Sequence, residues 1–149
     1  MESRPWSYEL IVVDDGSVDG TAEAVRNVHG KTTSVFCLMN GQNRGKGYSV
    51  RQGVNTARGS VVGYMDADYK TDISGLDSVM ESIEAGCDGV VGDRTQASSI
   101  IVRPRRGYRE VGSQLFKEMV HALLGLQNLG DTQCGFKFFK KNVMATLFT

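Results

Sequence analysis

The chain has 149 residues, of which 40% are hydrophobic and 23% are charged, so it is long enough to bury the core of one domain. Its 17 basic and 17 acidic side chains cancel, which gives no reason to expect nucleic-acid binding. Three scattered cysteines are too few for a disulfide framework or a zinc site and favour a reducing compartment. No apolar run approaches the roughly 18 residues of a membrane span, and no signal peptide opens the chain, so we expect a cytoplasmic protein.

Both ends of the sequence indicate a piece of a longer protein. A strand of the buried type is predicted over residues 9–13, directly after a short opening segment. At the other end the chain stops at Thr149, just after an apolar stretch. We therefore expect one domain, residues 1–149, that is incomplete at both ends.

The first predicted strand ends in a cluster of acidic and turn-forming residues. The β-branched run at residues 9–13 is typical of a strand covered on both faces, and it leads into Asp14-Asp15-Gly16-Ser17-Val18-Asp19-Gly20-Thr21. A helix over residues 22–28 should follow. An acid at such a strand end can accept hydrogen bonds from a base or a ribose, whereas Ser17 and Asp19 are better explained as helix caps.

A glycine-flanked lysine follows the second predicted strand, residues 34–39. The loop Asn40-Gly41-Gln42-Asn43-Arg44-Gly45-Lys46-Gly47 opens a helix that should run to residue 58. Neither the Walker spacing nor the GxGxxG order of dinucleotide-binding folds is present. Lys46 at a helix start can favour an anion such as phosphate, and simple helix entry explains the same residues equally well.

Two aspartates, Asp66 and Asp68, end the apolar run that starts at Val61. While the chain stays extended, residues i and i+2 leave the same face, so the two carboxylates should lie together. Such a pair calls for a hard divalent ion, typically Mg²⁺ or Mn²⁺, whose other positions are open to phosphate oxygens. The alternative is a surface turn with two solvated acids, but ligands of open α/β sheets bind at this end of the strands.

The charges segregate after this point in the chain. Residues 64–93 contain eight acids against Lys70 alone, whereas residues 94–109 contain five arginines and no acid. An acidic cation site followed by a basic anion site fits this order, and so do two solvated faces of opposite sign. The stretch 94–106 is expected to be a loop, followed by an amphipathic helix over residues 107–126 whose broad apolar face packs in the core.

The remaining elements are predicted from periodicity and turn residues. Thr71 or Asp72 should cap a helix, and a short strand should occupy residues 89–92. A polar turn at residues 130–135, with Cys134 as a small buried residue, leads into an aromatic strand and a short final helix. The apolar face of the helix after residue 72 is predicted to carry Ile73, Leu76, Met80 and Ile83.

Four motifs occur in order along the chain: Val13-Asp14-Asp15-Gly16-Ser17-Val18-Asp19-Gly20-Thr21, Asn43-Arg44-Gly45-Lys46-Gly47, Asp66-Ala67-Asp68, and Asp131-Thr132-Gln133-Cys134-Gly135-Phe136-Lys137. Together they resemble the motifs of family 2 glycosyltransferases, and more narrowly those of the dolichyl-phosphate glucosyltransferase branch and its polyprenyl-phosphate relatives. The resemblance covers almost the whole chain. It implies an α/β fold of the GT-A type, a Rossmann-like nucleotide-diphospho-sugar transferase domain with a mainly parallel sheet flanked by helices.

The resemblance also implies a reaction. A hexose, with glucose favoured, would pass with inversion from a nucleoside diphosphate sugar, with UDP favoured, to a dolichyl or polyprenyl phosphate. The cofactor would be Mg²⁺ or Mn²⁺, and the acceptor would place the enzyme at the cytosolic face of a membrane. On the donor side, Asp15 would contact the uracil with Asp14 beside it. Asp66 and Asp68 would hold the ribose edge and the metal on the diphosphate, and Lys46 joins the donor-binding candidates.

On the acceptor side, the resemblance assigns the lipid phosphate to arginines. These are Arg94, Arg103, Arg105 and Arg106. Asp68, Arg94 and Asp131 are the catalytic candidates, although turn formation is the first role expected of Asp131. The family's opening strand, whose loop also binds the nucleotide, has no counterpart before Trp6.

The charge of the acceptor determines what such a site must do. A phosphate monoester has its second pKa near ~6, so the nucleophile is already an anion at neutral pH. The site must then hold two anions together and neutralise the leaving group, and arginine suits bidentate phosphate binding. Two alternatives stay open: a sugar nucleotidyltransferase, and a non-catalytic fragment that binds nucleotide sugars. The oligomeric state does not follow from the sequence.

Overall fold

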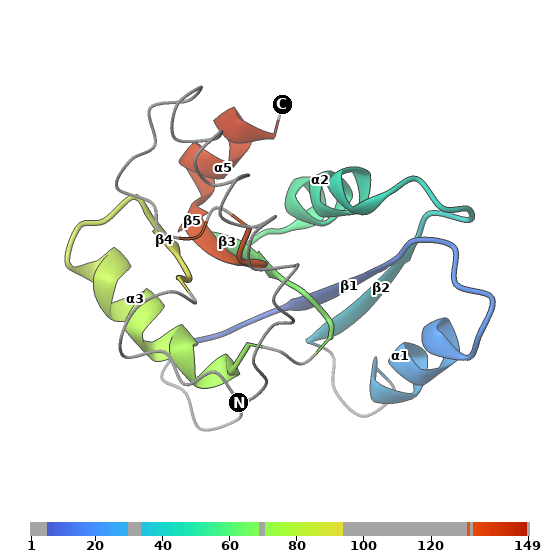
Figure 1. Ribbon diagram of the computed structural model, residues 1–149. Coiled ribbons are helices and arrows are strands. Elements are labelled where there is room, and N and C mark those ends of the chain that lie inside the picture. The colour runs from blue at the N-terminus through green and yellow to red at the C-terminus, as the bar shows by residue number, and fades with distance from the viewer. Residues whose placement is uncertain (1–5, 30–33, 69–70, 94–130, 132, 149) are drawn as a thin grey trace, which may run out of the picture.

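The computed structural model describes residues 6–29, 34–68, 71–93, 131 and 133–148. Within these residues strands alternate with helices, which confirms the expected α/β class (Figure 1). The predicted arginine loop and the long helix after it lie outside the described residues. In chain order the elements are β1 (Leu10–Asp14), α1 (Thr21–His29), β2 (Val35–Met39), α2 (Lys46–Thr56), β3 (Val61–Met65), a 3₁₀ turn (Ile73–Gly75), α3 (Leu76–Glu84), β4 (Gly89–Val91), β5 (Phe136–Lys140) and α5 (Lys141–Leu147).

The described strands form two sheets. β1 and β2 pair in parallel, with Leu10 opposite Val35 and Asp14 opposite Met39. The second sheet has the order β3-β5-β4, and β5 runs antiparallel to both of its neighbours. β3 and β4 are therefore parallel to each other, with the aromatic strand predicted near the C-terminus inserted between them.

Helix α2 connects the two sheets. It packs against both β1 and β3, although these two strands do not pair with each other in the described part of the chain (Figure 1). The contact with β1 is close, because a β-carbon on Gly53 would lie 3.3 Å from the Val13 side chain. At the opposite end of the strands, Glu9 accepts backbone hydrogen bonds from Arg58 (2.6 Å) and Gly59 (3.2 Å), which ties the start of β1 to the loop before β3.

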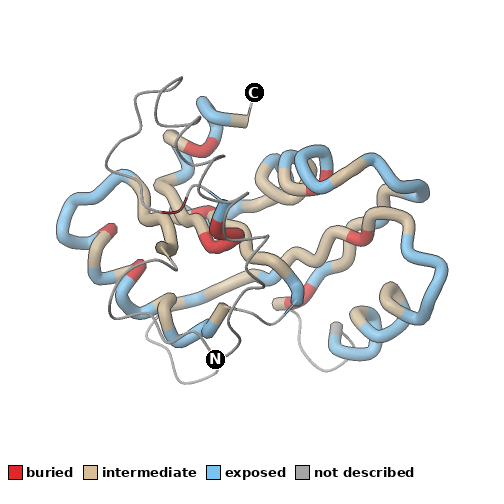
Figure 2. The backbone as a smooth tube through the Cα atoms, viewed as in Figure 1, coloured by how far each residue is buried: buried red, intermediate tan, exposed pale blue. Residues whose placement is uncertain are grey.

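The core lies where α3 covers the three-stranded sheet. Its most buried members are Val79 and Ile83 of α3, Phe136 of β5, and Cys134, which is 1% exposed as the sequence predicted. Figure 2 shows buried positions gathered in this central region, whereas α1 presents a largely exposed surface. Burial of these apolar side chains stabilises the sheet that carries β3 and its polar end.

The sequence was partly wrong about α3. Asp72 does act as a cap, because its carboxylate accepts a hydrogen bond from the Ser74 backbone, which also lowers the pKa of Asp72. The residues that follow form a 3₁₀ turn before α3 begins, so the helical period starts later than predicted. As a result Ile73 is exposed and Val79, which was not assigned to the core, is buried.

The β3–β5 pairing predicts a steric constraint at Gly63. This residue lies opposite Phe138, and a β-carbon there would approach the ring to 2.1 Å. We expect Gly63→Ala to lower the free energy of unfolding by about 1–3 kcal/mol through overpacking. Urea denaturation measures the change. Gly47→Ala is the matched control, because nothing lies within 4 Å of a β-carbon at Gly47 and alanine favours the helix. Equal midpoints for both variants would contradict this account.

Candidate active site

Polar residues from β1, β3 and the loop before α2 meet at one end of the molecule. Asp14 and Asp15 lie at the carboxyl end of β1, and Asp66 directly follows β3. The segment just before α2 contacts Asp15, and Lys46 in its first turn contacts Asp66. The N-terminus of α2 therefore lies against the carboxyl ends of both strands, the position at which open α/β sheets bind ligands.

Asp15 closes the loop between β2 and α2 onto the end of β1. One oxygen of its carboxylate accepts hydrogen bonds from the Asn40 side chain (2.7 Å) and the Arg44 backbone (2.9 Å). The other accepts from the Gly45 backbone (2.8 Å). The Asn40 side chain, followed by the Arg44 backbone N–H, lowers the pKa of Asp15 because these donors stabilise the charged form. Gly16 beside it has φ +83°, and a β-carbon there would lie 2.7 Å from the Asn43 backbone.

Asp14 differs from Asp15 in burial and in its partners. The residue is only 3% exposed, and its Oδ1 accepts a hydrogen bond from the Ser17 backbone (3.0 Å). Its Oδ2 is buried without a partner among the described residues. Buried polar atoms are seldom left in this state, so Oδ2 of Asp14 has acceptor capacity that the described residues do not use.

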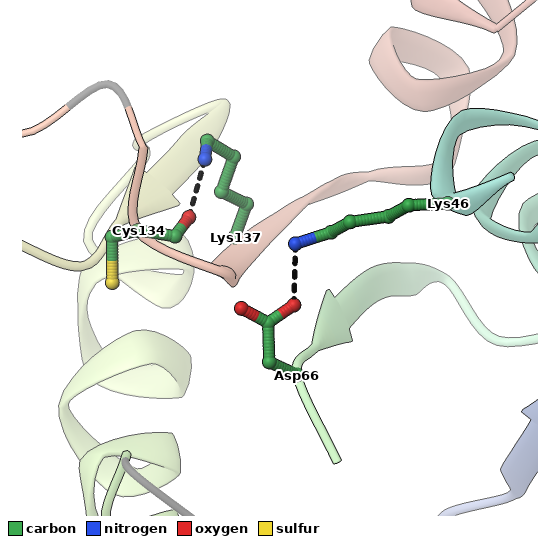
Figure 3. A network of polar contacts seen from close by, with 4 residues as sticks. All are labelled: Lys46, Asp66, Cys134 and Lys137. Carbon is green, nitrogen blue, oxygen red and sulfur yellow. Dashed lines mark hydrogen bonds and ion pairs between the residues drawn. The ribbon is translucent and has the colours of Figure 1, made fainter. Parts of the chain in front are cut away.

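Asp66 forms an ion pair with Lys46. Lys46 Nζ lies 2.5 Å from Asp66 Oδ1, and the two side chains are 62% and 39% exposed (Figure 3). The backbone N–H of Asp66 donates to the Gly135 carbonyl (3.0 Å), which fixes the end of β3 against the loop before β5. The lysine that the sequence placed in an anion loop thus contacts a predicted metal ligand.

The argument that placed Asp66 and Asp68 on one face needs correction. It assumed that the chain stays extended through both residues, but β3 ends at Met65, and Ala67 and Asp68 lie in a turn. Strand alternation therefore does not relate the two carboxylates. Asp68 is exposed at this turn.

The loop that precedes β5 supports Asp66 from behind. Asp131 and Cys134 are buried, and Oδ1 of Asp131 accepts from the Gln133 backbone (3.0 Å), which confirms its expected role in a turn. The Lys137 ammonium donates to the Cys134 carbonyl (Figure 3). A β-carbon on Gly135 would lie 2.2 Å from Asp66 Cγ, so only glycine leaves room for this carboxylate. Sequence reasoning gave Gly135 no role, although its place within the last motif marked it.

Asp66 is one of the two carboxylates predicted to hold a divalent cation. Carboxylate oxygens are hard ligands of the kind that Mg²⁺ and Mn²⁺ prefer, and the Lys46 ammonium already occupies a cation position on Asp66. Within the described ranges, no group of three His, Cys, Asp or Glu side chains could hold a metal. The carboxylate oxygens of Asp66, and of Asp68 in the exposed turn that follows, are donors of the kind that such a cation binds.

The predicted site residues form two groups, those that lie within the described residues and those that lie outside them. Asp14, Asp15, Lys46 and Asp66 gather around the start of α2, and Asp131 lies in the loop behind Asp66. The acceptor-side candidates lie outside the described residues. These are Arg94, Arg103, Arg105 and Arg106.

Comparison with known proteins agrees with this arrangement of motifs. The family profile described as Glycosyl transferase family 2 matches residues 5–148. The chain therefore belongs to glycosyl transferase family 2, and its strands and helices are those of a GT-A type, Rossmann-like domain.

Several individual members of the family are similar to this chain over almost its whole length. A dolichyl-phosphate beta-glucosyltransferase of Dictyostelium discoideum is 35% identical over 150 residues, which cover 96% of this chain and 46% of the relative. Proteins of the same name from Drosophila melanogaster and Homo sapiens are 33% and 30% identical, over 97% of this chain each and 46% and 47% of their own lengths. The chain thus spans about half the length of these relatives. No helix in the described part of the chain has the length and apolar character needed to cross a membrane.

The contact between Gly135 and Asp66 yields a prediction. Gly135→Ala should lower the free energy of unfolding by about 1–3 kcal/mol, because the new methyl group overlaps the Asp66 carboxylate. In an Asp66→Ala background the overlapping atoms are gone, so the same substitution should cost much less. Urea denaturation of the four proteins in this double-mutant cycle measures the coupling. An equal cost of Gly135→Ala in both backgrounds would rule out the steric account.

Proposed function

We propose that this chain binds a nucleoside diphosphate sugar with a divalent cation and transfers the hexose to a dolichyl or polyprenyl phosphate. UDP-glucose is the favoured donor, with inversion at the sugar carbon that is attacked. The observation that carries the proposal is the meeting of Asp66, at the end of β3, with Lys46, at the N-terminus of α2. This juxtaposition offers a carboxylate for a cation and an ammonium for a phosphate within one site.

The donor half of the proposal follows from ligand chemistry. Mg²⁺ or Mn²⁺ held by Asp66 and Asp68 would neutralise charge on the diphosphate as it becomes the leaving group. Lys46 and the backbone donors at the start of α2 favour the phosphate oxygens of the same group. In this proposal, oxygens of the diphosphate complete the ligand shell of the cation.

Recognition of the base is assigned to the end of β1. Asp15 already accepts three hydrogen bonds from the α2 loop, so a contact with the uracil would add to them. The Oδ2 atom of Asp14 has no described partner and is a second acceptor for a base or ribose donor. Both carboxylates stay candidates for the nucleoside.

The acceptor half rests on the names of the relatives and on charge. The relatives from Dictyostelium, Drosophila and human are named for dolichyl phosphate and glucose. In the proposed reaction a phosphate oxygen of the lipid attacks the sugar carbon while the bond from that carbon to the nucleoside diphosphate breaks. The attacking oxygen is already ionised near neutral pH, so the site must bring two anions together rather than remove a proton. Arginines suit this task, and the lipid places the reaction at a membrane surface, for which we favour the cytosolic face.

The donor site is tested first. Asp68→Asn should remove the Mn²⁺-dependent part of UDP binding, because the amide lacks the charge that holds the cation. Thermal-shift titrations with UDP-glucose, GDP-mannose and CTP, with and without Mn²⁺, measure binding for the wild type and the variant. Unchanged Mn²⁺-dependent affinity for UDP in the variant would remove the proposed metal role. Preference of the wild type for CTP would favour a nucleotidyltransferase.

The acceptor mechanism gives a ranking of variants. Asp131→Asn keeps the turn acceptor that Gln133 uses, so transfer from UDP-glucose to a short polyprenyl phosphate should change little. Arg105→Ala with Arg106→Ala should lose about tenfold to a hundredfold in rate, since a charge-assisted phosphate contact is worth about 1.5–3 kcal/mol. UDP binding by the arginine variant should stay normal. If Asp131→Asn is the inactive protein instead, the acceptor is deprotonated by a base, and an alcohol acceptor becomes the better interpretation.

A further inference from the structure

Lys46 occupies a position where its charge is unfavourable for the helix that carries it. It is the first residue of α2, whose first turn contains no acidic side chain and whose N-cap, Gly45, provides no side-chain cap. The partial positive charge at a helix N-terminus disfavours a cation there. A lysine that costs helix stability at an exposed site indicates a role outside the helix.

The partner of Lys46 supplies that role. Its ammonium reaches across from α2 to Oδ1 of Asp66 at the end of β3, 2.5 Å away (Figure 3). The Lys46 side chain is 62% exposed and its ammonium is carried on a flexible four-carbon stem, so it can leave this contact without disturbing the core. Asp66 cannot move away in the same manner, because Gly135 lies directly behind its carboxylate and the Gly135 carbonyl accepts a hydrogen bond from its backbone N–H.

We propose that Lys46 is an internal counter-ion that competes with the divalent cation for Asp66 until a diphosphate arrives. In the free protein the ammonium neutralises the carboxylate and weakens binding of the bare metal. When the nucleotide binds, its phosphate oxygens give Lys46 another anion beside the start of α2, and Asp66 becomes available to the cation. This inference rests on the proposed donor site and adds to it an order of events.

The consequence is cooperative binding of metal and nucleotide. Without Lys46, the bare cation should bind Asp66 more tightly, whereas the cation–nucleotide complex should bind less tightly because a phosphate contact is lost. These two effects have opposite signs. A lysine that served only as a phosphate ligand would change nucleotide binding alone, and a lysine that served only helix entry would change neither.

The expected size of the first effect is small and measurable. Exposed ion pairs of this kind shift binding by about 1.4- to 5-fold, so Lys46→Met should tighten Mn²⁺ binding by a factor in this range. The loss of a charge-assisted phosphate contact should weaken binding of Mn²⁺–UDP by about tenfold or more. Mn²⁺ affinity is measured by electron paramagnetic resonance of the free ion, with and without saturating UDP, on the unmodified chain and its variants.

Two further variants distinguish the effect of the Lys46–Asp66 ion pair from the effect of removing any positive charge near the site. Arg44→Met removes a like charge from the loop two residues before Lys46, but the Arg44 guanidinium lies over the Tyr48 ring, 5.0 Å from its centroid. It should therefore change Mn²⁺ affinity less than Lys46→Met. In an Asp66→Asn background, Lys46→Met should no longer tighten Mn²⁺ binding, because the carboxylate for which the two cations compete is gone.

Each outcome decides the proposal. Tighter Mn²⁺ binding by Lys46→Met, abolished in the Asp66→Asn background, supports the internal counter-ion. Unchanged or weaker Mn²⁺ binding by Lys46→Met, an equal gain in Arg44→Met, or absence of Mn²⁺ binding in both wild type and Lys46→Met overturns it. The donor site is judged separately by whether the wild type binds Mn²⁺–UDP, so a failure of the proposed function is distinguishable from a failure of this inference.

Discussion

The site depends on how α2 packs across two sheets. The helix contacts β1 and β3, which do not pair with each other in the part of the chain that is described. Its N-terminus consequently lies beside the carboxyl ends of both strands, where the preceding loop reaches Asp15 and the first turn reaches Asp66. Because β1 and β3 lie in different sheets, strand pairing does not bring Asp15 and Asp66 to the same site. A displacement of α2 along its axis would break both contacts, so the position of one helix sets the geometry of the whole polar cluster.

Acidic residues that look alike in the sequence have different physical roles. Asp72 and Asp131 satisfy backbone donors in their own turns, and Asp15 does so for a loop 29 residues away. Asp66 faces a cation, and Asp14 keeps one buried oxygen without a described partner. Carboxylates that accept backbone hydrogen bonds hold the frame, and acceptor capacity that these bonds leave over, as at Asp14, or an exchangeable cation, as at Asp66, can serve a ligand.

The environment of Asp66 combines two unequal restraints. Behind the carboxylate, Gly135 sets a steric limit that involves backbone atoms of the loop before β5 and therefore cannot move cheaply. In front of it, Lys46 provides an electrostatic contact that is exposed to solvent and easily exchanged. The Asp66 carboxylate is therefore held in place on one side and paired on the other with a cation that can be exchanged.

The sequence by itself determined the α/β class, the order of the described strands and helices to within a few residues, and the motifs that place the chain in its family. These features follow from local periodicity and turn chemistry, which act over a few neighbouring residues. The tertiary structure decided what the local pattern did not contain. It ended β3 at Met65, which removed the alternation argument for Asp66 and Asp68, and it inserted a 3₁₀ turn that exposed Ile73 and buried Val79. It also brought Lys46 to Asp66, 20 positions away, and placed Gly135, 69 positions away, behind the Asp66 carboxylate. Such contacts arise from the packing of helices and loops on sheets, and no local pattern along the chain predicts them.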